Sequence, residues 1–222
     1  MSSKKNKNKY PKEDLINTLN KLYRCRDLEI SNLWQRSIFL SVFLILCFTA
    51  YGYLMLDLVK VNYNANILNK YNIACLLLSS ISIIFSVIWI LMAKASKAWY
   101  EVYESAISKF EYQHFKRINL PYENIMGEMI FQKNQRNDSI FTTKGGAFSP
   151  SKINIAIGQI SLIIWIIVMI SHSVYNITII QLTENHIINT VLTIAIPLIT
   201  IIIVLYINLS KYVKSGFLIH NQ

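Results

Sequence analysis

The sequence predicts an all-α fold, a four-span transmembrane helical protein with a cytoplasmic helical stalk. The first observation behind this fold class is a set of four long apolar runs that lack Lys, Arg and Glu and hold a single Asp, Asp57, at the edge of the first run. A helix of about 20 apolar residues crosses the hydrocarbon layer of a membrane. The second observation is that basic residues gather in alternate segments between the runs. The runs are Ile38–Leu58, Ile73–Ala93, Ile153–Ser171 and Ile187–Leu209.

The distribution of basic residues predicts the orientation of these spans. Residues 1–37 and 94–152 carry nine Lys or Arg each, whereas residues 59–72 and 210–222 carry two each and residues 172–186 carry none. Because Lys and Arg stay on the cytoplasmic side, we expect both termini and the middle segment to be cytoplasmic. The chain is rich in Ile, Asn, Lys and Tyr, a composition typical of an AT-rich bacterial genome. The expected location is therefore the bacterial cytoplasmic (inner) membrane, crossed in several passes.

The formal net charge of +10 fits two classes of partner, nucleic acid and anionic lipid. Basic residues close to the headgroups of a membrane are each favourable by about 1 kcal/mol. We therefore interpret the charge as lipid-facing and expect no nucleic acid. The expected partners are the lipid bilayer and further copies of the chain, with a cytoplasmic protein partner as an open alternative.

These patterns divide the chain into five segments. A cytoplasmic tail and amphipathic helix precede the first transmembrane hairpin, and a cytoplasmic helical region with a loop separates it from the second hairpin. A short cytoplasmic tail follows. The expected bounds are 1–37, 38–93, 94–152, 153–209 and 210–222.

Two cytoplasmic segments continue the spans beside them as helices. Apolar residues recur at helical spacing over 12–36 and 97–118, and neither segment has Gly or Pro where it meets its span. We expect two long antiparallel helices whose apolar stripes pair into a stalk or pack against other subunits. We also expect glutamates of the second helix to pair with arginines of the first. The candidate stalk contacts are Arg24, Arg26, Trp99, Tyr103, Glu101 and Glu104.

Small and polar residues share one face of the second span and one face of the fourth, and Asn154, Gly158 and Ser161 do the same in the third. Two interpretations stay open, which are close packing of helix against helix and a polar lining in an oligomer. Ionisable residues at mid-membrane usually mark transport pathways, and their scarcity in the runs argues against an ion-coupled transporter. The candidate packing or pore-lining residues are Ser79, Ser82, Ser86, Asn189, Thr193, Pro197, Thr200 and Asn208.

The sequence offers no recognisable catalytic, cofactor-binding or metal-binding constellation. The three cysteines form no Cys-x-x-Cys motif. His172 and His186 bracket the second outer loop with Glu184 nearby, but no third ligand is well placed. We therefore expect a protein that is not an enzyme and needs no cofactor or metal.

Three stretches of the chain resemble a known bacterial family. They are RDLEISNLWQRS at 26–37, SKAWYEVYE at 96–104 and FSPSKIN at 148–154. Together they resemble the RipA family of octameric bacterial inner-membrane proteins, with Ala95 where that family has Gly and Tyr103 where it has a second Trp. The resemblance implies an octameric assembly linked to adaptation inside host cells, and it brings no catalytic residues. The long helical hairpin is also similar, in architecture alone, to SLATT-type effectors of bacterial conflict systems.

Two functional hypotheses follow. The first is a non-enzymatic oligomeric assembly of the inner membrane that acts in stress or host adaptation. The alternative is a pore-forming or membrane-perturbing effector of a phage-defence or conflict system. If the protein has a working part inside the membrane, we expect it in the third and fourth runs, which form a pair with a charge-poor outer loop and a polar stripe on the fourth.

Overall fold

The computed structural model describes residues 10–60, 65–120, 138–139, 148–180, 186–210 and 213–214. Its regular elements over these residues are four helices, α1 (Lys12–Lys60), α2 (Ala65–Ile118), α3 (Pro150–Ile180) and α4 (His186–Leu209). All four are long and apolar enough to cross a membrane. The predicted all-α class and the four spans are confirmed. Most of the two predicted tails and of the loop before α3 lies outside the described residues.

The helices contribute to two compact units, which we describe separately. The two-helix unit (Met1–Arg36 and Met92–Ile153) holds the first part of α1 and the last part of α2. The four-helix unit (Ser37–Leu91 and Asn154–Gln222) holds the remainder of both helices together with nearly all of α3 and the whole of α4.

Each of the first two helices is unbroken from its polar segment into its apolar run, as predicted. α1 begins with Glu13 and Asp14 in its first turn, where acidic side chains favour the positive end of the helix dipole. α2 ends at Ile118. Asn119 follows with a φ of 56°, and the Leu120 amide donates to the Phe115 carbonyl at 3.0 Å. This is a Schellman cap, in which Asn tolerates the left-handed conformation.

α3 is longer than the apolar run that predicts it. Ser149 and Pro150 begin it in the way expected for a cap followed by the first helical turn. The helix then continues to Ile180, so the expectation that residues 172–186 form a loop is wrong for its first nine residues. Two polar side chains that follow the apolar run, His172 and Asn176, are buried against neighbouring helices.

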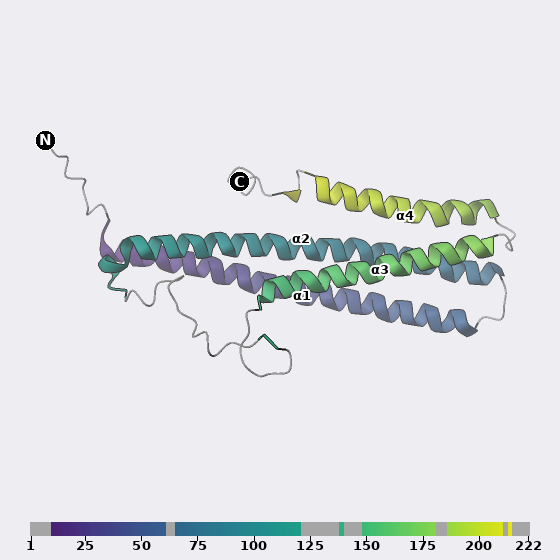
Figure 1. Cartoon of the computed structure of the whole chain (residues 1–222), viewed down its shortest axis with the longest axis horizontal. Helices are drawn as coiled ribbons and strands as arrows, with labels where there is room; N and C mark the ends of the chain where they lie inside the picture. The colour runs from purple at the N-terminus through teal and green to yellow at the C-terminus, as the bar shows by residue number, and fades with distance from the viewer. Residues whose placement is uncertain are drawn as a thin grey trace. The chain divides into compact units, whose positions relative to one another are not determined.

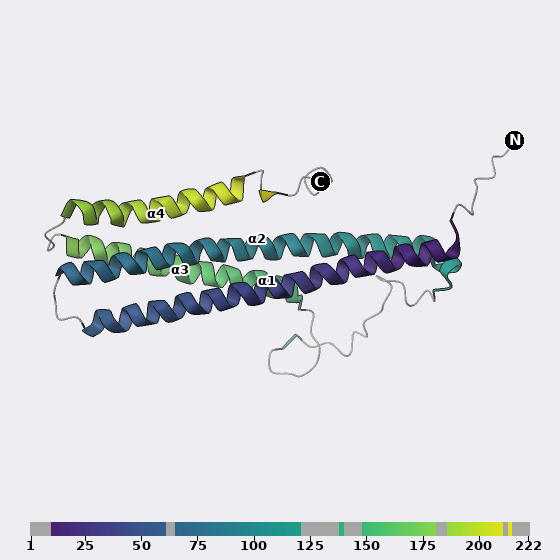
Figure 2. The same cartoon turned by 180° about the vertical axis from the view of Figure 1, so that it is seen from behind.

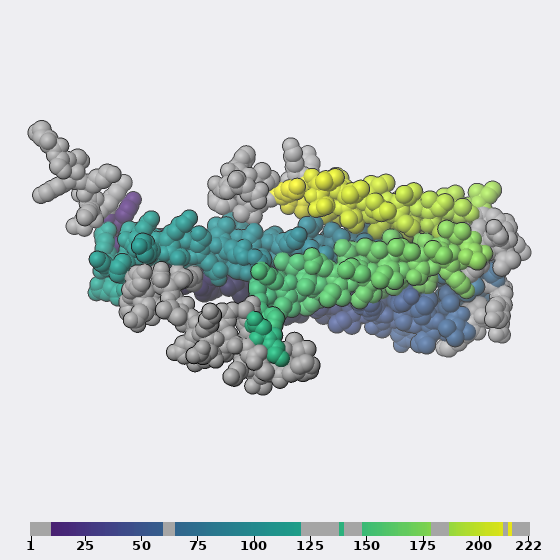
Figure 3. Space-filling view, viewed as in Figure 1, coloured from purple at the N-terminus to yellow at the C-terminus, as the bar shows by residue number. Residues whose placement is uncertain are grey.

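The helices of the four-helix unit run antiparallel in chain order (Figure 1; Figure 2). The rings of Phe43 in α1 and Phe85 in α2 stack with centroids 3.8 Å apart, and Phe48 packs on Trp165 of α3 at 4.6 Å. Figure 3 shows α3 and α4 side by side on one face of this unit. We call the end where α1 and α3 finish and α2 and α4 begin the hairpin end.

The four-helix unit buries polar residues and exposes apolar ones. Its buried residues include more Ser, Thr, Asn and His than apolar side chains, whereas most of its large aliphatic side chains face outward. Ile187 and Ile202 of α4, for example, are 80% and 63% exposed. This is the reverse of a soluble core. It is the arrangement expected when the surroundings are lipid and helices meet through small and polar residues.

The two-helix unit has the opposite distribution. Leu15, Leu19 and Leu33 of α1 and Ile107 of α2 are buried and form its core. Charged residues are mostly exposed around them. A buried carboxyl, that of Glu111, also lies within this core.

Candidate functional site

The buried polar residues of the four-helix unit form a series of hydrogen-bonded groups between helices. The first group joins three helices through Asn154 of α3. The Trp89 indole donates to Asn154 Oδ1 at 3.0 Å, and Asn154 Nδ2 donates to Ser37 Oγ at 2.6 Å. The carboxamide therefore uses both of its ends, one on α2 and one on α1. Asn154 lies in the FSPSKIN stretch, so this part of the resemblance corresponds to an anchor for the start of α3.

The predicted serine face of α2 lies against α3. Ser79, Ser82 and Ser86 are fully buried. Each hydroxyl donates to a carbonyl of its own helix, which satisfies the group without a water molecule. Because the Ser86 proton goes to the Ser82 carbonyl, Ser161 must donate in the 3.0 Å contact between Ser86 Oγ and Ser161 Oγ.

The predicted stripe of α4 lies mostly inside the same chain. Thr200 Oγ1 is 2.8 Å from Ser80 Oγ of α2, and Thr193 Oγ1 accepts a hydrogen bond of 2.5 Å from Asn176 of α3. Asn189 is buried as well. Pro197 is half-buried and Asn208 is exposed, so these two candidates stand apart from the rest.

The hairpin end contains a histidine whose tautomer follows from its neighbours. Asn72 Nδ2 donates to the Leu68 carbonyl at 3.0 Å, which turns Asn72 Oδ1 toward His172 Nδ1 at 2.8 Å. That oxygen can only accept, so His172 carries its proton on Nδ1. His172 Nε2 is then the acceptor for the Tyr51 hydroxyl at 3.2 Å. The result is one continuous hydrogen-bonded row from α1 through α3 to α2.

No sequence pattern predicted this row of hydrogen bonds. Asn72 and His172 lie just outside the apolar runs, and only polar residues within the runs were expected to lie in the membrane. The helical spacing of Asn72 with Cys75 and Ser79, and of His172 with Asn176, could have indicated that both faces continue to the hairpin end. The metal alternative involves Glu184 and the side chain of His186, which lie outside the described residues. The described residues hold no group of three ligand-type side chains.

In the two-helix unit the expected pairing of arginines with glutamates is wrong for two of the candidates. Arg26 pairs with Asp27 beside it in α1 at 2.6 Å, and Glu101 pairs with Lys97 one turn earlier in α2. Neighbours on the same helix are already within reach, so these charges need no partner across the unit. The Lys97–Glu101 pair also raises the pKa of the Lys97 amine.

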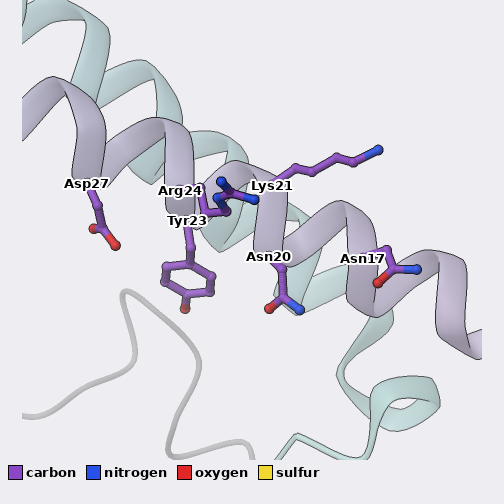
Figure 4. A pocket seen from close by; sticks show the side chains of 6 residues that line it. All are labelled: Asn17, Asn20, Lys21, Tyr23, Arg24 and Asp27. Atoms are coloured by element: carbon purple, nitrogen blue, oxygen red, sulfur yellow. The ribbon is translucent and has the colours of Figure 1, made fainter.

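The other four candidate stalk contacts, two aromatic and two charged, lie at different positions in the two-helix unit. Trp99 and Tyr103 stack on each other along α2 with centroids 6.2 Å apart. Arg24 lies at an open hollow of about 600 Å³, and the described side chains that line it all come from α1 (Figure 4). Glu104 lies near enough to Lys97 to act on its amine. The described groups at this hollow come from a single helix and do not by themselves enclose a ligand, so we assign no chemistry to it.

Two part-buried side-chain hydrogen bonds join the helices of the two-helix unit among the described residues. In the first, Arg36 Nη1 of α1 donates to Ser96 Oγ of α2 at 2.9 Å. In the second, the Tyr23 hydroxyl of α1 donates to Glu111 Oε1 of α2 at 2.5 Å, and Glu111 is 1% exposed. Burial, then the hydrogen bond to Glu111 and its charge, raise the pKa of Tyr23 from 10.0 to about 12. The aromatic residue and the carboxyl therefore hold α1 and α2 together where the pattern suggested arginine and glutamate.

We expect Tyr23 to make the stability of the two-helix unit sensitive to alkaline pH. Its pKa is higher in the folded state, so its contribution is complete below pH 10 and is lost as the pH rises toward 12. Phenolate absorbance of the wild type minus that of Tyr23→Phe should show one group titrating near pH 12. Glu111→Gln should bring that group back toward pH 10. A difference spectrum that already titrates near pH 10 in the wild type would contradict the assignment.

Comparison with known proteins gives one family. Residues 16–175 match the family described as the octameric membrane protein family (8xMP). The chain belongs to this family. The match includes most of α1, all of α2 and most of α3, and it ends before α4. No curated protein and no solved structure shows significant similarity to the chain.

Membership in this family and the four candidate spans make the chain a multi-pass membrane protein of a homo-oligomeric family. The polar interior and apolar surface of the four-helix unit agree with a location in the membrane and with contacts between subunits. α4 lies outside the matched residues, although it is bonded to α2 and α3 through its threonines.

Proposed function

We propose that the protein is a non-enzymatic structural assembly of the bacterial inner membrane, built from eight copies of the chain. The observation that supports this proposal is that polar side chains of the spans form hydrogen bonds with other helices of the same chain. Thr193, Thr200, Ser86 and Asn154 all bond to neighbouring helices of the four-helix unit. Most of the large side chains that remain outside are aliphatic and suit contact with lipid or with other subunits.

The competing function is a pore lined by the stripe of α4. Such a lining would need Thr193 and Thr200 to face an aqueous path, yet both are buried against α3 and α2 of the same chain. Exposing them to a path would break the contacts to Asn176 and Ser80. The described structure therefore favours a scaffold over a channel.

Flux through liposomes tests the two functions against each other. We expect the purified oligomer to release no more of a small dye than empty liposomes do, and native mass spectrometry to show eight chains per particle. A pore-forming peptide serves as the positive control for release. Dye release that Thr200→Leu or Thr193→Leu alters would overturn the scaffold proposal in favour of the pore. A monomer in mild detergent and in lipid would overturn the octamer.

The proposal includes a cytoplasmic stalk, formed by the two-helix unit, and cytoplasmic termini. The native cysteines give a direct test, because Cys25 is exposed in the two-helix unit whereas Cys47 and Cys75 are buried in the four-helix unit. A membrane-impermeant maleimide should label Cys25 in inverted vesicles and leave it unlabelled in intact spheroplasts. Cys25→Ser should abolish the labelling.

A cysteine at the other end of the first span provides the matched control. Val59 is 83% exposed at the hairpin end of α1. In a Cys25→Ser background, Val59→Cys should react in spheroplasts and be protected in inverted vesicles. If Cys25 is labelled from the outside, the positive-inside assignment and the cytoplasmic stalk are both wrong.

The biological setting we propose is adaptation to stress or to life inside host cells. Its support is the resemblance of residues 26–37, 96–104 and 148–154 to the RipA family. Deletion of the gene should reduce survival under envelope stress or within host cells, and the intact gene should restore it. Survival that depends instead on phage challenge would favour the conflict-system alternative.

A further inference from the structure

Three buried asparagines lie at one level of the four-helix unit, near the hairpin end. Asn69 of α2, Asn176 of α3 and Asn189 of α4 are 3%, 0% and 8% exposed. We call them the asparagine layer. Asn69 and Asn176 each carry a buried Oδ1 atom that has no hydrogen-bond partner among the described residues.

The contact between Asn72 and His172 fixes the level of this layer. Asn72 Oδ1 and His172 Nδ1 are 2.8 Å apart. Asn69 lies three residues from Asn72 toward the hairpin end, and Asn176 lies four residues from His172 in the same direction. At a rise of 1.5 Å per residue, these offsets differ by only about 1.5 Å. The two residues therefore lie one turn beyond the pair, on the faces of α2 and α3 that meet there.

The third asparagine joins the layer through α4. Asn176 Nδ2 donates to Thr193 Oγ1, and that hydroxyl donates to the Asn189 carbonyl at 2.8 Å. Asn189 thus begins the same turn of α4 that Thr193 ends. The layer brings together α2, α3 and α4, and its two unpartnered atoms are both acceptors.

We propose that a water molecule is bound in the asparagine layer and donates its two hydrogens to Asn69 Oδ1 and Asn176 Oδ1. A buried carbonyl oxygen without a donor carries a penalty of about 1–3 kcal/mol, and buried water typically satisfies two to four such groups. Water supplies two donors and no charge. A metal ion would need more oxygen ligands and a balancing negative charge, whereas the layer is composed of neutral carboxamides.

The bound water would join α2 to α3 and would hold in place Asn176, whose Nδ2 donates to Thr193 of α4. Asn69 belongs to the matched residues, whereas Asn176 and Asn189 follow them. The inference does not depend on whether the assembly is a scaffold or a pore, since either would need α4 held in place.

A double-mutant cycle tests whether Asn69 and Asn176 share one bound molecule. In the octamer in lipid nanodiscs, Asn69→Leu should lower the thermal unfolding midpoint, because it removes one partner of the water and leaves Asn176 Oδ1 without a donor. Asn69→Leu with Asn176→Leu should lower the midpoint by less than the sum of the two single changes. The matched control is Asn208→Leu, an exposed asparagine of α4, which should leave the midpoint unchanged. A higher midpoint for Asn69→Leu, or strict additivity, would overturn the proposal.

Two further measurements on the unmodified protein identify the bound molecule. A high-resolution map should show a density peak within hydrogen-bond distance of both oxygens, and the midpoint should be the same in sodium, potassium and choline buffers. A midpoint that falls only in choline would assign the layer to a monovalent cation and overturn the water. Direct contact between the two carboxamides in the map would overturn any bound molecule.

Discussion

Replacing Gly158 with alanine should destabilise the four-helix unit by about 1–3 kcal/mol, the usual cost of overpacking. A Cβ atom at this position would lie 2.9 Å from Ile90 Cγ1 and 3.2 Å from Trp89 Cδ1. Trp89 cannot move away easily, because its indole is bonded to Asn154. The free energy of unfolding, measured by titration with sodium dodecyl sulfate, should fall accordingly, and Gly158→Leu should lower it further.

Gly52 is the matched control for this prediction. It lies in α1, and a Cβ atom there would meet nothing within 4 Å. Gly52→Ala should therefore leave the free energy of unfolding unchanged or raise it by up to about 1 kcal/mol, the gain expected from helix propensity. Equal effects at the two glycines would show that α2 and α3 do not approach each other at Gly158 as described.

Trp165→Ala should have the largest effect, a loss of about 3–5 kcal/mol in the free energy of unfolding. Trp165 is fully buried and packs against Phe48 and Tyr51 of α1, with centroids 4.6 Å and 5.8 Å away. Truncation would leave a cavity between α1 and α3 and remove the contacts of both rings. The same detergent titration would measure the loss.

Trp165→Phe separates the volume of this side chain from its polar atom. The Trp165 indole nitrogen is buried and has no partner among the described residues, so phenylalanine removes an unpaired donor while it keeps most of the aromatic packing. We expect a cost well below that of Trp165→Ala. If Trp165→Phe is as destabilising as Trp165→Ala, the indole N–H must have a partner in the assembled protein.

The sequence allowed the spans to be predicted because membrane insertion depends on local composition. Two of the four apolar runs, Ile38–Leu58 and Ile187–Leu209, reach within two residues of the hairpin end of their helices. α3 differs because His172 and Asn176 resemble loop residues in composition. Their burial depends on Asn72 and Thr193 in other helices, and no local pattern contains those partners.

For the candidate site, the sequence predicted which residues share a helix face but not which residues form hydrogen bonds between helices. The spacing of Ser79, Ser82 and Ser86 placed them on one side of α2 before the structure was known. The contact of Ser86 with Ser161, and of Thr200 with Ser80, depends on how far α3 and α4 are shifted along α2. For α3 that shift depends on packing around Gly158 and Trp165, which the spacing of residues within one helix does not report.

The polar interior of the four-helix unit also constrains how the protein is made. α3 carries Asn154, Ser161 and Asn176 on the side that faces α2 and α4 in the finished unit. During synthesis α3 leaves the ribosome before its α4 partner exists, and a lone helix with these groups in hydrocarbon would leave side-chain donors and acceptors unpaired. α1 and α2 must therefore be inserted before α3 can pack against them. α4 then packs last, against the surface that the first three helices form. A chain stopped before α4 should remain longer with the insertion machinery than the full chain does.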